Sequence, residues 1–206
     1  MNLDKLILVD PNLGLCQAWT EAFQKLENVE IVNDRFENLM EFDCMVSAAN
    51  SYGLMDGGVD LAIINFFGPE LQTDVQGHIS EHYYGEQPVG TSFIARTNNA
   101  SHPYVAHTPT MRVPRNIAGT EAVYQSMRAM LIAVHNFNKE ENLIKIVACP
   151  GLGTATGRVP YEAAALQMSL AYKFMLEKPS RIDWALAHHR NNELINSKFL
   201  DLKNKT

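Results

Sequence analysis

The sequence predicts a three-layer α/β/α sandwich around a mixed, largely parallel central sheet. Three observations lead to this fold class. Short apolar segments alternate along the chain with longer amphipathic ones, and the amphipathic segments are long enough to cover both faces of a sheet. In addition, two of the apolar segments lead into glycine-rich loops that lead in turn into helices. This order of elements is typical of parallel strands covered by helices on both sides.

Helical and strand periodicity places the elements one by one. The expected strands span residues 3–9, 29–32, 44–48, 91–96, 104–107, 145–149 and 181–187. The expected helices span residues 11–26, 59–67, 71–84, 120–139, 161–176 and 192–202. Gly68-Pro69 separates the second helix from the third, because proline cannot continue a helix. The two tryptophans, Trp19 and Trp184, are expected to be core aromatics.

Composition limits the class of protein. The 206 residues are 46% hydrophobic and 19% charged, which fits one globular domain over residues 1–206. A formal charge of -6 argues against nucleic acid as a partner, since binding phosphates that way requires clustered Lys and Arg. No apolar run has membrane-spanning length, so no membrane partner is expected. The oligomeric state stays open.

The cysteines and the first nine residues bear on the cellular location of the protein. Cys16, Cys44 and Cys149 form no Cys-x-x-Cys pair, and two of them lie in apolar strands, so reduced core residues are expected. Residues 1–9 carry charges and no small-residue cleavage site, unlike a signal peptide. The sequence therefore predicts a cytoplasmic protein.

Two glycine-rich loops carry the functional signal. The first, residues 50–58, follows an apolar strand and ends in Gly57 and Gly58, where the backbone can approach a bound group closely. The next helix presents free amides at its start, and these attract anions. The second loop, residues 150–157, also joins a strand to a helix, and this helix opens with Pro160 at its first turn. Because ligands in such folds bind at the carboxyl ends of strands, the two loops are expected to hold one phosphate-bearing ligand.

Four segments resemble the macro domain family, in the same order and over nearly the whole chain. They are Ser-Ala-Ala-Asn-Ser at 47–51, Gly-Gly-Val-Asp-Leu-Ala-Ile at 57–63, Tyr-Val-Ala-His-Thr at 104–108, and Pro-Gly-Leu-Gly-Thr at 150–154. Macro domains bind ADP-ribose and related nucleotides. Several members hydrolyse ADP-ribose from proteins or dephosphorylate ADP-ribose 1''-phosphate. The resemblance implies a metal-independent hydrolase without cofactor, whose partner is ADP-ribose or an ADP-ribosylated protein. The alternative is a reader that binds without turnover.

The resemblance also implies two catalytic residues. Asn50 would orient the distal ribose, and Asp60 would position or activate a water near the anomeric carbon. A carboxylate beside a diphosphate should have a raised pKa, which suits a general base. Each residue has a simpler explanation: an Asn after a strand often bonds to its own turn, and an Asp in the first turn of a helix is favoured by the helix dipole.

Further residues are implied as ligand contacts. Asp34 would accept a hydrogen bond from the adenine amino group, and its simpler explanation is a turn or helix cap. The other implied contacts belong to the two loops and are Ala49, Ser51, Asp56, Gly57, Gly58, Val59, Gly151, Leu152, Gly153, Thr154, Ala155, Thr156, Gly157 and Arg158.

The sequence departs from the pattern of the hydrolytic members at two places that favour the reader. Asp56 stands where many members have a glycine. The aromatic residue that often packs on the distal ribose is replaced by residues 155–156, Ala-Thr. Tyr52, Phe66 or Tyr161 could substitute for it.

A third hypothesis is a zinc peptidase. His78, Glu81 and His82 fit the H-x-x-E-H pattern, which places two histidines one helical turn apart. The pattern is short, and no downstream acidic ligand is marked. Histidines on the wet face of an amphipathic helix explain it more simply, so no metal site is expected.

Overall fold

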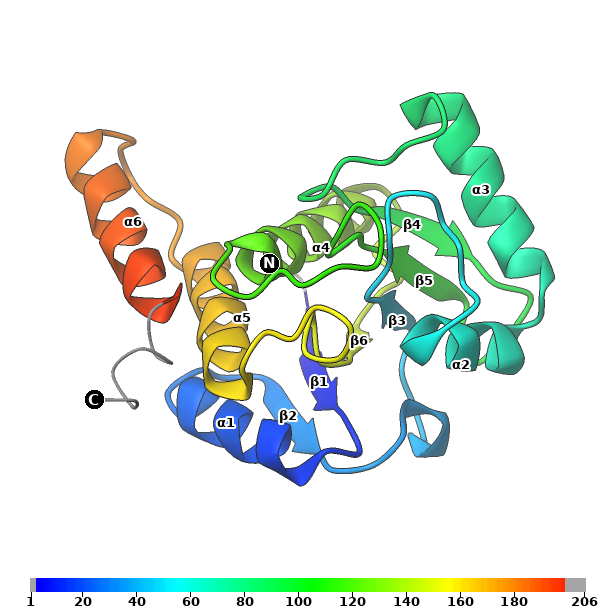
Figure 1. Ribbon diagram of the computed structural model, residues 1–206, viewed down its shortest axis with the longest axis horizontal. Helices are drawn as coiled ribbons and strands as arrows, with labels where there is room; N and C mark the ends of the chain where they lie inside the picture. Colours follow the sequence, from blue (N-terminus) through cyan, green and yellow to red (C-terminus); the bar gives the residue numbers. More distant parts are fainter. Residues whose placement is uncertain (1–2, 199–206) are drawn as a thin grey trace.

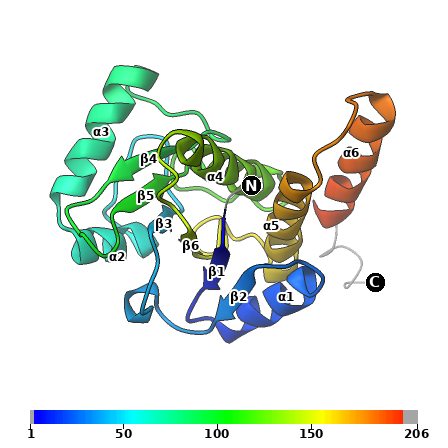
Figure 2. The same cartoon turned by 180° about the vertical axis from the view of Figure 1, so that it is seen from behind.

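The computed structural model describes residues 3–198, which form one mixed sheet with helices on both faces (Figures 1 and 2). The strands are β1 (Lys5–Val9), β2 (Val29–Val32), β3 (Cys44–Ser47), β4 (Phe93–Arg96), β5 (Tyr104–His107) and β6 (Ile146–Cys149). The helices are α1 (Leu13–Phe23), η1 (Phe36–Asn38), α2 (Gly58–Phe67), α3 (Glu70–Tyr83), α4 (Ala122–Glu140), α5 (Tyr161–Leu176) and α6 (Trp184–Lys198).

The sheet has the strand order β2-β1-β6-β3-β5-β4. Every neighbouring pair is parallel except β4 and β5, which pair antiparallel. The predicted mixed, largely parallel sheet is therefore confirmed. The two strands that precede the glycine-rich loops, β3 and β6, are direct neighbours, with Cys44 opposite Val147 and Met45 opposite Ala148. Both loops consequently leave the sheet at the same edge.

Two hydrophobic cores lie on the two faces of the sheet. Because side chains alternate along a strand, Leu6 and Leu8 pack with α1, α4 and α5, whereas Ile7 and Val9 pack with α2, α3 and η1. Figure 1 shows these two groups of helices on opposite sides of the strands. The predicted three layers are confirmed, and the sheet is covered on both faces.

The predicted strand at 181–187 is wrong. Helix α6 begins at Trp184, and the Asp183 side chain accepts a hydrogen bond from the Leu186 amide at 3.0 Å, as a helix cap does. The alternation of Ile182, Trp184 and Leu186 imitates a strand, but Ile182 and Trp184 are 85% and 78% exposed. Trp184 is thus no core residue. Trp19, by contrast, is fully buried as predicted.

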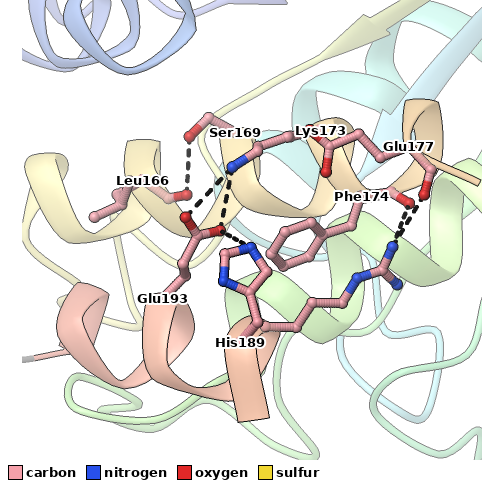
Figure 3. A network of polar contacts seen from close by, with 8 residues as sticks. Leu166, Ser169, Lys173, Phe174, Glu177, His189 and Glu193 are labelled. Atoms are coloured by element: carbon pink, nitrogen blue, oxygen red, sulfur yellow. Dashed lines mark hydrogen bonds and ion pairs between the residues drawn. The ribbon is translucent and has the colours of Figure 1, made fainter. Parts of the chain in front are cut away.

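Helix α6 packs on α5 and stands apart from the sheet (Figure 1). Glu193 accepts hydrogen bonds from Lys173 Nζ at 3.2 and 3.3 Å, and it lies 4.0 Å from His189 (Figure 3). Arg190 stacks over Phe174 at 4.6 Å. These contacts hold α6 to the outside of the domain. The predicted helix 192–202 coincides with α6 up to residue 198, and its remaining residues lie outside the described part of the chain.

None of the helices within residues 3–198 is long and apolar enough to cross a membrane. The three cysteines, Cys16, Cys44 and Cys149, are free and buried, in agreement with their expected place in the core.

Candidate functional site

A cavity of about 420 Å³ lies at the carboxyl edge of the sheet, where the parallel strands end. Its size falls in the range of small-molecule sites, roughly 300–1,000 Å³. Residues of the segments that follow four parallel strands line it: Asp10 after β1, Ala48 to Asn50 after β3, Thr110 and Met111 after β5, and Pro150 and Gly151 after β6. Figure 1 shows the cyan loop after β3 and the yellow loop after β6 at this edge. The two glycine-rich loops therefore converge on one cavity, as predicted.

The first loop begins with a turn that Asn50 closes. Asn50 Nδ2 donates to the Leu54 carbonyl at 2.7 Å, and Asn50 Oδ1 accepts from the amides of Tyr52 and Leu54 at 3.0 and 3.3 Å. The side chain thus bonds to its own turn, as the simpler explanation expects, and it also lines the cavity. One hydrogen of the Asn50 amide group remains available to a ligand.

The first loop ends at the start of α2. The first amides of α2, like those of any helix, have no intrahelical partner. Gly57 precedes the helix and has no side chain that could cap them. Gly57 and Gly58 both line the cavity, and no heavy atom lies within 4 Å of the position that a Cβ would take at either residue. The positive φ of Gly58, 58°, favours glycine. The cavity wall here is bare backbone with amides suited to an anion.

The second loop folds tightly on itself. The Val159 amide donates to the Gly153 carbonyl at 3.1 Å, and the Ile117 amide donates to the Gly157 carbonyl at 2.9 Å. A Cβ at Gly157 would lie 2.4 Å from the Gly153 oxygen, so only glycine fits there. The loop lines the cavity with Gly151 and with the run from Gly153 to Gly157.

Asp60 is a buried carboxylate at the edge of the cavity. It is 6% exposed, it lines the cavity, and its Oδ1 accepts a hydrogen bond from Ser47 Oγ at 2.7 Å. Burial raises the pKa of Asp60 to about 6, Ser47 opposes this effect, and the negative charge of Asp56 adds to it. A carboxylate with such a pKa is ionised at neutral pH and can still take up a proton, as a general base must.

The charged residues of the lining are mostly acidic. Asp10, Glu37, Asp56 and Asp60 line the cavity, and Arg35 is the one cationic side chain among the lining residues. An anionic ligand would therefore depend on backbone amides for much of its attraction.

Most of the predicted site residues come together in this cavity. Those that line it are Ala49, Asn50, Asp56, Gly57, Gly58, Val59, Asp60, Gly151, Gly153, Thr154, Ala155, Thr156 and Gly157.

Four predicted ligand residues lie outside the lining. Asp34 Oδ1 accepts from the Arg35 amide and from Asn38 Nδ2, both at 2.7 Å, so its carboxylate is bonded within its own turn, and these bonds lower its pKa. Ser51 and Leu152 are buried. Arg158 is exposed and has a positive φ of 53°.

None of the suggested aromatic replacements lines the cavity. The Tyr52 hydroxyl donates to Glu86 at 2.7 Å, and the Tyr161 hydroxyl accepts from Asn12 at 2.8 Å. Phe66 packs edge-on against Phe36, with ring centroids 5.5 Å apart, and it is Phe36 that reaches the cavity. The aromatic surface of the site thus comes from Phe36 of η1.

The H-x-x-E-H histidines belong to the packing of α3. The His78 ring stacks on Phe93 at 3.9 Å, and the His82 ring lies 4.2 Å from that of His78. Within residues 3–198, no group of three His, Cys, Asp or Glu side chains could hold a metal ion. The described residues thus give the zinc hypothesis no third ligand.

Sequence reasoning missed several residues of the site. Asp10, Thr110 and Met111 follow β1 and β5, and the rule that ligands bind at carboxyl ends of strands could have found them. Ser47 is the partner of Asp60, and strand alternation could have placed it on the face that α2 covers.

The comparison with known families decides the relationship. A family model described as Macro domain matches residues 46–168, which is more than half of the chain and includes both glycine-rich loops. The chain belongs to the macro domain family. Proteins similar to it include one from Aquifex aeolicus, 33% identical over 129 residues, or 63% of this chain and 72% of that protein. One from Pyrobaculum aerophilum is 31% identical over 134 residues, or 65% and 69%. Both are described as uncharacterized.

Solved macro domains share the fold. A mutant of the Oceanobacillus iheyensis macrodomain with ADPR aligns with a TM-score of 0.57 at 20% identity, over 95% of this chain and 97% of that chain. The same macrodomain with ADP gives 0.56 at 21% identity, over 84% and 90%. The macrodomain of Thermus aquaticus DarG gives 0.56 at 19% identity, over 82% and 90%. At these identities the likeness extends to the fold of this macro domain and no further.

Proposed function

We propose that this macro domain binds ADP-ribose or a close derivative in the cavity and hydrolyses ADP-ribose from modified protein side chains or from ADP-ribose 1''-phosphate. One observation carries the proposal: two glycine-rich loops meet at a cavity that also holds a buried carboxylate with a pKa of about 6. Family membership supports it, as do the Oceanobacillus macrodomain structures that contain ADP and ADPR.

The diphosphate would lie between the two loops. On one side it would meet the amides at the start of α2, where Gly57 and Gly58 leave room for it. On the other side it would meet the turn from Gly153 to Gly157. Phe36 and Arg35 would border the adenine end, and Asn50 the distal ribose.

In the reaction, Asp60 would take a proton from a water molecule while the water oxygen bonds to the anomeric carbon. The bond from that carbon to the leaving oxygen breaks, and the leaving group receives the proton. Asn50 would donate its remaining amide hydrogen to a ribose hydroxyl and so hold the sugar in line with the water. No metal takes part in this scheme.

The alternative is a reader of ADP-ribose that does not hydrolyse it. The 6% exposure of Asp60 favours this alternative, because a substrate water must reach the carboxylate. So does Asp56, whose negative charge borders the cavity. The absence of an aromatic residue in the second loop has the same implication.

Release assays on the wild type and on Asp60→Ala separate the two functions. We expect the variant to bind ADP-ribose by calorimetry and to release it from a modified protein about 10²–10⁴-fold more slowly. Asp74→Ala, which removes an exposed carboxylate of α3, is the matched control and should release at the wild-type rate. Binding without release by the wild type would establish the reader. No heat with ADP-ribose, when AMP and GDP also give none, would overturn both.

A further inference from the structure

Asp60 has one hydrogen-bond donor within residues 3–198, the Ser47 hydroxyl. Ser47 is fully buried and is not among the residues that line the cavity. It donates to Oδ1 at 2.7 Å. Its hydroxyl therefore acts on Asp60 without touching a ligand.

The other carboxylate oxygen has no hydrogen bond in the described part of the chain and is not fully enclosed. Asp60 Oδ2 has no hydrogen-bond partner within residues 3–198. It is not a buried atom either, because the one buried side-chain nitrogen or oxygen without a partner in that part of the chain is His107 Nε2. The two oxygens thus differ: Oδ1 is bonded to the sheet, and Oδ2 is left for water.

Ser47 is well placed to fix this orientation. It is the last residue of β3, whose neighbours β5 and β6 pair with it on both sides. Asp60 lies in the first turn of α2. The hydrogen bond therefore ties the start of a helix to a strand in the interior of the sheet.

No described cation competes with Ser47 for the carboxylate. His107 of β5 stands opposite Ser47 in the parallel register, and burial lowers its pKa to about 3, so it is neutral. Burial also lowers the pKa of His78 on α3. The charged group that does act on Asp60 is Asp56, which repels the carboxylate. The Asp60 carboxylate is thus oriented by the neutral hydroxyl of Ser47 and not by an ion pair with a described cation.

We propose that Ser47 is a positioning residue for the hydrolysis: it holds Oδ1 of Asp60 and so presents Oδ2 to the attacking water. This role rests on the proposed function. Because a hydrogen bond to the charged form favours that form, Ser47 also keeps Asp60 ionised at a lower pH than burial alone would allow.

The test measures Asp60 in two ways, in the wild type and in Ser47→Ala. The first is the titration of the Asp60 side-chain carboxyl by ¹³C NMR, assigned by the loss of its signal in Asp60→Asn. The second is the pH dependence of ADP-ribose release. In Ser47→Ala we expect both the carboxyl midpoint and the acid limb of release to move to higher pH by about one pH unit, because a charged acceptor loses its donor. The affinity for ADP-ribose at pH 8 should stay within about twofold, since Ser47 does not reach the ligand.

Two further variants keep the test decisive. Ser47→Cys is nearly isosteric and a weaker donor, so it should move both midpoints in the same direction by less. It also replaces Ser47→Ala if that protein does not fold. Ser169→Ala removes the hydroxyl of another buried serine, which lies on α5 and donates to the Leu166 carbonyl at 2.9 Å, and it should move neither midpoint.

Unchanged midpoints in the folded Ser47 variants would overturn the role of Ser47 while leaving the hydrolase intact. So would a carboxyl midpoint that moves without the acid limb of release. Failure of the proposed function looks different, because the wild type itself would then release no ADP-ribose, and the positioning role would end with it.

Discussion

The two glycine-rich loops resemble each other in sequence and differ in what their glycines do. In the first loop, Gly57 and Gly58 face open space: a Cβ at either position would meet nothing within 4 Å. In the second loop, a Cβ at Gly151 would lie 2.5 Å from Leu15, and one at Gly157 would lie 2.4 Å from the Gly153 carbonyl oxygen. The first pair of glycines keeps the cavity open. The second pair lets the loop pack against the protein.

The difference shows that one sequence signal can have two physical causes. A glycine-rich connection between a strand and a helix can leave room for a ligand, or it can make room for neighbouring protein atoms. In this macro domain the loop that leaves room also leads into Asp60, and the loop that packs tightly lines the same cavity. Substitutions in the two loops should therefore affect different properties.

The largest effect is expected on stability, from Gly157→Ala. The new methyl group would overlap the Gly153 carbonyl oxygen and also approach Ile117 at 2.8 Å, and a backbone atom cannot move aside cheaply. We expect the free energy of unfolding to fall by about 1–3 kcal/mol, the usual cost of overpacking. Urea unfolding followed by circular dichroism measures it. The matched control is Gly77→Ala in α3, where a Cβ meets nothing within 4 Å, and where alanine should leave stability unchanged or raise it. Equal stability of Gly157→Ala and the wild type would contradict this prediction, because it would mean that the packing of the second loop does not require glycine at this position.

Much of the fold followed from local patterns. The strands β1 to β6 lie where the apolar segments predicted them, because a buried parallel strand needs a short run of apolar residues. The failure at 181–187 has a local cause as well. Ile182, Trp184 and Leu186 alternate as in a strand, but Asp183 caps the helix that follows it, and the exposed side chains have no sheet to join. Asp183 is a residue type that favours the start of a helix, and this local preference outweighs the alternation around it.

The site was predictable in its backbone and less so in its side chains. The glycine motifs placed both loops, and the adjacency of β3 and β6 brought them together. Side-chain orientation depends on contacts between distant segments, which no local pattern contains. Asn50 turns partly into its own loop, and Asp34 turns toward Asn38, four residues away. Asp60 bonds to Ser47, which lies beneath it on the sheet.

A smaller effect, on binding rather than stability, is expected from Gly57→Ala. Gly57 has an extended backbone, with φ −156° and ψ 161°, which alanine can adopt, and its Cβ would enter open space beside the cavity. We expect the free energy of unfolding to change by less than about 1 kcal/mol. The affinity for ADP-ribose should fall by about tenfold or more, because the methyl group occupies the place of the ligand. Calorimetry and thermal unfolding of the same sample test both parts. A large loss of stability with unchanged affinity would show that Gly57, like Gly157 in the second loop, is required for packing and not for binding.

The smallest effect is expected from Asp56→Asn, which changes charge and keeps the shape of the first loop. Burial is the main cause of the raised pKa of Asp60, and the negative charge of Asp56 adds to it. Without that charge the pKa of Asp60 should fall below about 6. In the proposed hydrolysis the ionised carboxylate is the active form, so release should increase as the pH rises through this pKa, and its acid limb should move to lower pH in the variant. Glu37→Gln is the matched control: it neutralises another carboxylate of the lining, one that is not among the groups that perturb Asp60, and should leave the limb in place. A shift of equal size in both variants would mean that the net charge of the cavity sets the pKa of Asp60. Asp56 of the first loop would then have no effect beyond its contribution to that charge.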